Sequence, residues 1–498
     1  MITSLTRRAA RRVAAAALAA ATLACGDSTE PPNDDVATLT AVGLSVVPGQ
    51  VGTTLAAPLT VVARSQAGTP VAGVEVAWTV ASGGATLVDV VERTDAAGNA
   101  TARVRLPAVA GSAEIRATAA GLTPVVFTIV GQEAPTEITV AAEVPVARSY
   151  GLHDTFVRDG IAFASAWDTG LILYDVGNGM RGGTPAAPVE ISRIVTSAQG
   201  STSGPNVHNA WWFHNPVTGE KRYVFVGQEG PGGVGTRRAS GDIHVVDVSD
   251  MTQPQEVAFF HVENAGVHNF WMDEQAQILY AAYYNGGVLA LDVSGTLSGD
   301  LASRAISRIQ PGGTSATFTW GVMLANGSLY ASDMWSGLHQ IRSQNGQLTR
   351  VAGGAVPDRW TSDLWIHGGW AYTGTWGGNA RSGNNGDALK IWQLAADGAP
   401  TLVDSLIYPD VATTSDVEVS ADGKYLLVTA EGFTGGGLYL YSLADPRRPQ
   451  ILGSVAVAAG LHTGTFATIG GRRYVFGARN PGVAAPAMMI YDVSAVAP

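Results

Sequence analysis

The sequence predicts an all-β protein in which a β-sandwich is followed by a seven-bladed β-propeller. Three observations lead to this prediction. The chain has 498 residues, of which 61 are glycine and 24 are proline, so it is rich in turns. Residues 36–133 contain short strands of alternating polarity with no helical period. From residue 134 onward, one strand pattern returns seven times, roughly every 50 residues.

The composition of the chain limits the classes of function. Hydrophobic residues make up 46% and charged residues 14%, which suits packed cores and not a disordered chain. The formal net charge is −11, and no basic patch offsets it, so nucleic acid is excluded as a partner. The single cysteine excludes a disulfide framework.

Residues 1–24 have the pattern of an export signal. An arginine-rich stretch over residues 7–12 precedes an apolar run that is too short to cross a bilayer, and the only cysteine, Cys25, follows directly. This arrangement resembles a bacterial lipoprotein signal. The resemblance implies that Cys25 is lipidated and that the protein is exported and anchored in the membrane of the cell envelope, at the outer membrane or cell surface. The alternative is an ordinary secretory signal that is cleaved near residue 24.

Residues 25–35 are polar and acidic and contain two adjacent prolines. We expect them to form a semi-extended linker between the anchor and the folded part of the chain.

Residues 36–133 have the strand spacing of a small β-sandwich. Apolar and polar residues alternate in LTVVARS (59–65), VEVAWTV (74–80) and AEIRATA (113–119). The motifs GTPVAGVEVAWTV (68–80) and TDAAGNA (94–100) resemble the bacterial Ig-like domains of group 1, the invasin and intimin type. The resemblance implies a spacer or adhesive stalk, in which Trp78 is a core residue.

The last 365 residues, 134–498, repeat a strand that ends in a short apolar run. The copies are GLILYDV (170–176), DIHVVDV (242–248), GVLALDV (287–293), GLHQIRS (337–343), ALKIWQL (388–394), GLYLYSL (437–443) and MMIYDVS (488–494). Two further strands precede each copy. Seven such groups of strands predict a propeller with seven blades. The YDV, VDV and LDV endings resemble the bacterial LVIVD-repeat propellers. The fourth to sixth copies depart from that ending, so the blade boundaries are least defined there.

The segment TEITVAA (136–142) is a strand that belongs to no complete repeat, while the last repeat ends after its third strand. We expect this segment to supply the outer strand of the last blade, so that the two ends of the ring are joined and an open sheet edge is avoided.

Four of the nine histidines occupy one position of the repeat. The inner strands open with the pairs His153-Asp154, His208-Asn209, His268-Asn269, Thr319-Trp320, Ser362-Asp363, Ser415-Asp416 and His462-Thr463. Inner strands line the channel of a propeller, so the four histidines are expected to converge near one mouth. Imidazole is a ligand for zinc, copper, iron and nickel. Asp154, Asp363 and Asp416 are candidates to orient the histidines by hydrogen bonds.

Three interpretations of this histidine column stay open. It is a transition-metal site, a structural ring of hydrogen bonds between blades, or the floor of a small-ligand site. The column follows no HExxH or cysteine–histidine spacing that would single out the first.

A second set of residues is expected on the same face, because the second strand of a blade returns to the face where the first begins. These candidates for a ligand-binding face are Trp167, Glu229, Tyr284, Trp335, Trp376, Glu431 and Arg479. Aromatic rings beside polar groups suit a carbohydrate, a peptide or an aromatic small molecule. The alternative is that the rings cover the blade cores.

The sequence contains no GxSxG elbow, no GxxxxGK[ST] loop and no cysteine-based redox site, so no catalytic residue is assigned. The leading hypothesis is therefore a cell-envelope lipoprotein that presents a binding face to a ligand or an envelope protein, and whether it is also an enzyme stays open. The alternative is a metal-dependent hydrolase or oxidoreductase that uses the histidine column. A third hypothesis is a purely structural component of the envelope.

Overall fold

The computed structural model describes residues 35–55, 57–107, 110–132, 138–146, 151–197, 204–230, 232–480 and 485–498. The predicted signal segment, Cys25 and the linker up to residue 34 lie outside these residues, as do the first two residues of the predicted strand 136–142. In the part of the chain that the structure describes, no helix is long and apolar enough to cross a membrane. The chain divides into two compact units, one up to residue 133 and the other from residue 134.

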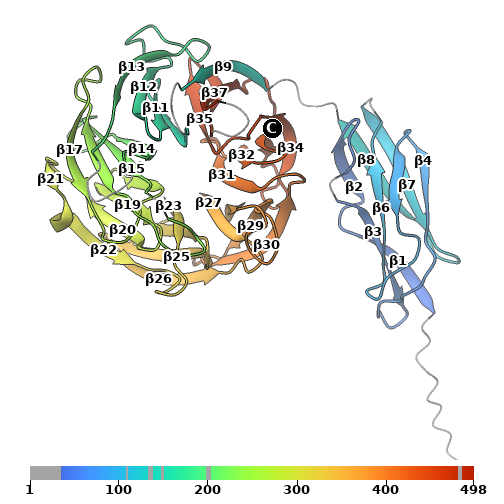
Figure 1. Cartoon of the computed structure of the whole chain (residues 1–498). Coiled ribbons are helices and arrows are strands. Elements are labelled where there is room, and N and C mark those ends of the chain that lie inside the picture. The colour runs from blue at the N-terminus through green and yellow to red at the C-terminus, as the bar shows by residue number, and fades with distance from the viewer. Residues whose placement is uncertain are drawn as a thin grey trace, which may run out of the picture. The chain divides into compact units, whose positions relative to one another are not determined.

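The first unit is built from two four-stranded sheets (Figure 1). In order across the sheet, one consists of β1 (Val36–Val42), β3 (Leu59–Ser65), β6 (Asn99–Arg105) and β5 (Thr86–Val90). The other consists of β2 (Val46–Gln50), β8 (Val125–Gln132), β7 (Gly111–Thr118) and β4 (Ala77–Ser82), with β2 and β8 parallel. One hydrophobic core holds the two sheets together, and in it the rings of Trp78 and Phe127 stack with centroids 6.1 Å apart.

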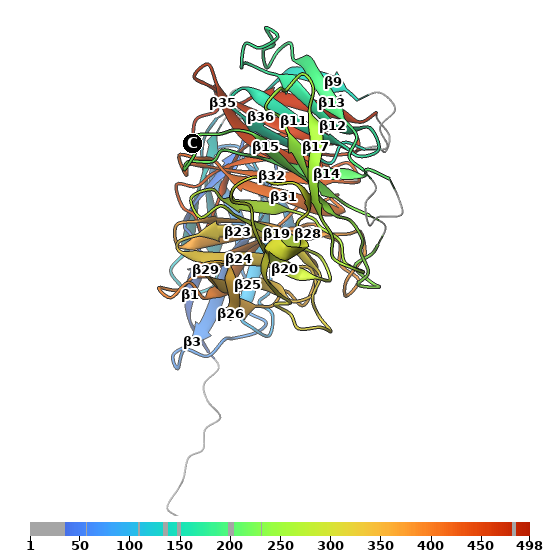
Figure 2. The same cartoon turned by 90° about the vertical axis from the view of Figure 1, so that its left-hand side faces the viewer.

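The second unit is a β-propeller, a ring of antiparallel sheets arranged around a central axis (Figure 1; side view in Figure 2). The first sheet consists of β10 (Asp154–Arg158), β11 (Ile161–Ala166), β12 (Gly170–Asp175) and β13 (Val189–Ile194). The second consists of β14 (Val207–Phe213), β15 (Tyr223–Gln228), β16 (Ile243–Asp247), β17 (Gln255–Phe260) and the short β21 (Gly299–Asp300). The third consists of β18 (Phe270–Asp273), β19 (Ile278–Tyr283), β20 (Gly287–Asp292) and β22 (Ala305–Ile309). A single 3-10 turn, η1 (Ala302–Arg304), precedes β22.

The remaining sheets continue the ring. They are β23 (Thr319–Ala325), β24 (Ser328–Asp333), β25 (Gly337–Gln344) and β26 (Gln347–Gly354); β27 (Trp360–His367), β28 (Trp370–Trp376), β29 (Ala388–Leu394) and β30 (Pro400–Ile407); β31 (Thr413–Val419), β32 (Tyr425–Glu431), β33 (Gly437–Ser442) and β34 (Gln450–Ala456); and β35 (Thr463–Ile469), β36 (Arg472–Arg479), β37 (Ala487–Asp492) and β9 (Thr139–Pro145). The β27–β30 and β31–β34 groups join in one eight-stranded sheet through the pair Thr375 and Thr414.

The inner strands form a closed cycle. Each of β10, β14, β18, β23, β27, β31 and β35 contacts the next, and β35 contacts β10 again. The outer strand of the last sheet is β9, which pairs antiparallel with β37 over residues 139–145 and so joins the first and last strands of the unit. The hydrophobic cores lie between neighbouring sheets, because strands of two adjacent sheets contribute to each of them. This packing holds the inner strands rigidly around the axis.

Candidate metal centre

The four predicted histidines lie at one structural position at the start of the inner strands. His153 immediately precedes β10, His462 immediately precedes β35, and His268 lies two residues before β18. His208 is in β14 at a β-bulge, since the pairing with β15 shifts between Val207 and Asn209. A bulge inserts one extra residue into a strand and re-aims its side chain, and bulges are frequent beside functional sites.

The same bulge occurs in β23 and corrects the predicted alignment there. The pairing of β23 with β24 shifts between Thr319 and Gly321, so Trp320 occupies the place that His208 has in its own sheet. The isolated bridges agree, because Val207 pairs with Trp167 and Thr319 pairs with Tyr284. The predicted opening pair Thr319-Trp320 is therefore one residue too early.

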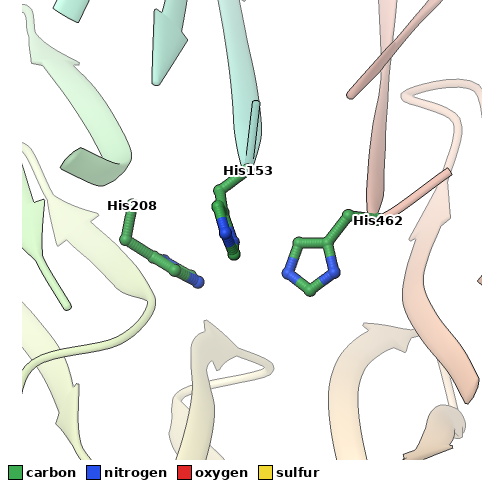
Figure 3. Close-up of side chains that lie close together, drawn as sticks. All are labelled: His153, His208 and His462. Carbon is green, nitrogen blue, oxygen red and sulfur yellow. The ribbon is translucent and has the colours of Figure 1, made fainter. Parts of the chain in front are cut away.

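The four imidazoles are brought together in the structure, and we call His153, His208, His268 and His462 the histidine cluster. Ring centroids are 5.2 Å apart for His153 and His208, 4.7 Å for His153 and His462, and 4.1 Å for His208 and His268. In Figure 3 the ring of His153 lies between the rings of His208 and His462. Donor atoms of these three residues lie within 4.8 Å of one another. Donor atoms of His208, His268 and Glu229 form a second set with the same property.

The ring nitrogens of the cluster differ in their partners. His268 Nδ1 lies 2.8 Å from the carbonyl oxygen of Trp320, which requires the proton on Nδ1 and leaves Nε2 as a lone-pair donor. His462 Nδ1 lies 3.1 Å from Glu431 Oε1. Metal-binding histidines characteristically hold the second ring nitrogen by a carbonyl or carboxylate in this way.

His153 and His208 carry nitrogens without a hydrogen-bond partner. His208 is only 1% exposed, and neither of its ring nitrogens has one; the same holds for Nδ1 of His153. A buried polar atom without a partner costs about 1–3 kcal/mol, so such atoms call for an explanation. A metal ion between the rings would supply a partner for one nitrogen of each ring.

The electrostatics favour neutral rings at three of the four histidines, His153, His208 and His268. Burial, together with the neighbouring imidazoles, holds the pKa of His153 and of His208 well below the usual range. Burial lowers the pKa of His268 to about 3. Burial also opposes charge on His462, but the Glu431 carboxylate outweighs this and raises the pKa of that imidazole. Neutral imidazole is the form that binds a metal.

Two carboxylates reach the cluster. Glu229 Oε2 lies 3.6 Å from His208 Nε2, and its other oxygen accepts a 2.6 Å hydrogen bond from the hydroxyl of Tyr284. Glu431 contacts His462 and accepts a hydrogen bond from Asn480. Burial raises the pKa of Glu229, whereas for Glu431 the charge of His462 outweighs burial and lowers it.

Two aromatic residues beside the cluster have strained backbones. Trp167 has φ 36° and Tyr284 has φ 33°, in the left-handed region that bulky residues rarely enter. Trp167 stacks on His153 with centroids 4.2 Å apart, and Tyr284 lies 4.8 Å from His268. Backbone strain of about 1–3 kcal/mol per residue is kept mainly at functional sites, where the surrounding structure imposes it.

An aromatic cavity of about 210 Å³ adjoins the cluster through Glu229. Its wall contains Trp167, Tyr284, Phe318, Trp320, Trp376 and Met334, together with residues 230, 232–234 and 239 of the loop after β15. A cavity of about 150 Å³ is enough to hold benzene, so this one accepts a small aromatic molecule.

The predicted ligand-binding face is only partly assembled. Trp167, Glu229, Tyr284 and Trp376 line the aromatic cavity, and Glu431 lies at the cluster. Two other members of that face lie elsewhere.

Trp335 packs on Trp360 with centroids 4.5 Å apart and donates its indole N–H to the carbonyl of Val234. Arg479 is turned toward β9, where it pairs with Glu143 at 2.6 Å. Neither side chain forms part of the cavity wall.

The carboxylates predicted to orient the histidines make other contacts. Asp363 accepts a hydrogen bond from Asn269, and Asp416 accepts one from the backbone N–H of Gly464. Asp154 accepts one from the N–H of Thr155. The carboxylates that reach ring nitrogens of the cluster are Glu229 and Glu431 instead.

Sequence reasoning missed Phe318, Trp320 and Met334, which line the aromatic cavity. The sequence held no signal for Trp320, because the bulge that places this tryptophan where its neighbours have histidine is visible only in the strand pairing. Phe318 and Met334 carry no signal either, since apolar residues in strand-rich loops are common.

No protein-family model matches the chain, and no curated protein sequence matches it. The crystal structure of the mitotic checkpoint complex contains a chain that is 13% identical, with a TM-score of 0.47 over 72% of this chain and 94% of that one. The β-propeller domain of Cps50 (Swd1) from Myceliophteria thermophila is 12% identical, with a TM-score of 0.46 over 71% of this chain and 100% of that one. Both likenesses concern the fold alone.

Proposed function

We propose that this protein is a lipoprotein of the bacterial cell envelope whose propeller is a metal-dependent enzyme, a hydrolase or an oxidoreductase. In this proposal Cys25 carries the lipid anchor and residues 36–133 form an Ig-like stalk. Residues 134–498 form a seven-bladed propeller of the LVIVD-repeat type. The closed cycle of inner strands and the pairing of β9 with β37 support the closed propeller in this description.

The observation that carries the metal assignment is the environment of His208. Its imidazole is buried, both ring nitrogens lack a hydrogen-bond partner, and it belongs to both sets of converging donors. A structural ring of hydrogen bonds would have paired these nitrogens. Imidazole donors suit zinc, copper, iron or nickel, and the metal would supply Lewis-acid or redox chemistry.

Glu229 links the cluster to the aromatic cavity. It lies against His208 on one side and forms part of the cavity wall on the other. Because Tyr284 holds one of its oxygens, the carboxyl group is fixed in a place where it can move a proton between the cluster and a bound molecule. The wall is mostly aromatic, so the proposed substrate is a small aromatic or apolar molecule.

The metal content of the purified protein tests this proposal. Elemental mass spectrometry of the wild type is compared with the His208→Ala/His268→Ala variant and with His367→Ala, which alters an exposed histidine outside the cluster. We expect near-stoichiometric transition metal in the wild type and in His367→Ala and a loss of most of it in the double variant. A folded wild type that takes up no metal on reconstitution would refute the metal site.

Cobalt reconstitution tests whether the site is catalytic. Catalytic metal sites keep an open coordination position, and structural ones do not. Azide is therefore expected to change the visible spectrum of the cobalt protein. An unchanged spectrum would mean that the metal has no open coordination position and that the site is structural.

A second candidate function is a binding protein that presents the same face to a carbohydrate, a peptide or an envelope protein. The aromatic wall of the cavity favours it, because such a wall binds ligands without a metal. If the protein folds normally but contains no metal, the binding function would be the supported one.

A further inference from the structure

A second cavity, of about 220 Å³, lies further along the inner strands, away from the histidine cluster. The residues that directly follow the cluster position in each strand form its first layer, which includes Asp154, Asn209, Asn269, Asp363 and Asp416. The residues two places further on form the next layer. We call this space the carboxylate cavity.

Four carboxyl groups face the carboxylate cavity: Asp154 from β10, Asp363 from β27, and Asp416 and Glu418 from β31. Asp363 and Asp416 are neighbours, and burial together with the charge of Asp416 raises the pKa of Asp363. Within the described lining, no lysine, arginine or histidine balances these groups. The cavity is therefore unsuited to an anion.

An unpaired amide also faces the carboxylate cavity. Asn209 is 4% exposed, and its Oδ1 has no hydrogen-bond partner. By contrast, the amide of Asn269 donates to Asp363 at 2.9 Å. The oxygen lies beside Gly227 of β15, so the amide adds a polar but uncharged group to the cavity wall.

An aromatic wall covers the far side of the carboxylate cavity. Ring centroids are 5.3 Å apart for Phe156 and Trp211, 5.5 Å for Trp211 and Trp271, and 6.0 Å for Trp271 and Trp365. Phe156, Trp211 and Trp271 also line an adjoining hollow of about 600 Å³, which offers a path of entry. These rings are half-buried, so their faces are not sealed inside a core.

We propose that the carboxylate cavity binds a small organic cation, an amine or a quaternary ammonium group, with its charge between the carboxylates and the tryptophan faces. Tryptophan faces attract cations, and aromatic cages with nearby acids are the usual receptors for alkylammonium groups. The volume equals that of about seven water molecules, which suits a ligand of several heavy atoms. This proposal does not rest on the metal site.

The spacing of the carboxylates argues against a metal ion as the occupant. Among the described residues, sets of three donors within 4.8 Å of one another occur only in the histidine cluster and Glu229. The carboxylates are more widely spread, as a polyatomic cation with its charge dispersed over methyl or methylene groups requires.

Protonation of the carboxyl groups agrees with this assignment. Burial, reinforced by Asp416 and Asp154 and opposed by Thr465, raises the pKa of Glu418 to about 8. Burial and Asp416 raise the pKa of Asp363 well above its ordinary value. On the cluster side, the charge of His462 favours the ionised form of Asp416 and so partly opposes burial. A bound cation favours ionised carboxylates, so binding is expected to release protons.

Calorimetric titration of the purified protein with choline tests the proposal, and 3,3-dimethylbutan-1-ol serves as the neutral molecule of the same shape. We expect choline to bind at least tenfold more tightly than the alcohol at pH 8. Absence of choline binding up to about 10 mM, in protein with a normal unfolding transition, would overturn the proposal. Equal binding of the alcohol would also overturn it, because the site would then recognise shape without charge.

Matched variants locate the binding. Trp271→Leu and Asp363→Asn/Asp416→Asn should each weaken choline binding at least tenfold, whereas Trp335→Leu and the exposed Asp404→Asn should leave it unchanged. If the double variant does not fold, Glu418→Gln replaces it, because that change keeps the shape of a half-buried side chain. Choline affinity that survives both the tryptophan and the carboxylate changes would place the cation elsewhere and overturn the assignment. The metal content of each variant is measured in parallel, so that a loss of choline binding can be told apart from a loss of metal at the histidine cluster.

Discussion

The imidazoles of His208 and His268 come from neighbouring sheets of the propeller and lie with ring centroids 4.1 Å apart, tilted by 47°. Two protonated rings at this distance would repel each other in a buried site. The pair therefore stays neutral at neutral pH, because burial lowers the pKa of both imidazoles.

The first prediction concerns acid sensitivity of metal-free protein. Because the pKa of His268 is about 3, the folded state does not take up this proton when the unfolded state does, near pH 6.5. Stability is thus present above pH 6.5 and is lost as the pH falls toward 3. His268→Gln should retain up to about 4 kcal/mol of the free energy of unfolding that the wild type loses between pH 7 and 4. Urea titrations check this, with His367→Gln expected to follow the wild type.

The second prediction has the opposite sign. The pKa of Glu418 is raised from 4.5 to about 8, so the folded state holds a proton that the unfolded state releases above pH 4.5. Stability from this group is present at low pH and is lost as the pH rises from 4.5 to 8. Glu418→Gln should therefore be more stable than the wild type at pH 8, by up to about 4 kcal/mol, and equal to it near pH 4. A stabilisation that does not depend on pH would contradict this account.

The third prediction concerns Gly321, where the inner strand β23 borders the channel. A Cβ atom there would lie 2.7 Å from Leu364 Cδ2 and 2.8 Å from Asp363 Oδ1. Gly321→Ala should cost about 1–3 kcal/mol of stability and displace Asp363, which would also weaken choline binding. The control is Gly369→Ala, where a Cβ meets nothing within 4 Å. Thermal unfolding of both variants gives the comparison.

The fourth prediction tests the strand that joins the ends of the ring. Arg479 is buried and pairs with Glu143 of β9, so Glu143→Ala leaves a buried guanidinium without its partner. We expect a loss of about 1–3 kcal/mol in denaturant unfolding. The matched pair Arg193 and Glu190 lies on the surface, and Glu190→Ala should cost at most about 1 kcal/mol. Equal losses would mean that the contact with β9 adds nothing.

The repeat was enough to predict that four histidines share one structural position, because the repeat length and the residue type can both be read from the sequence. It could not show that Trp320 takes the same position, since a bulge shifts the register by one residue without changing the pattern of apolar residues. The sequence also could not predict the direction in which a long side chain points. Arg479 stands at the predicted strand end, but its partner Glu143 lies 336 residues earlier in the chain.

The pairing of β9 with β37 also constrains how the protein is made. The strand at the start of the propeller finds its partner only in residues 487–492, almost the last of the chain. Until those residues arrive, the first hydrophobic core lacks Met488 and Ile490. Contacts between such distant parts of a chain form slowly, and an unpaired strand edge is prone to aggregate in the meantime. The growing chain must therefore be kept apart from its neighbours until residues 487–492 have been made.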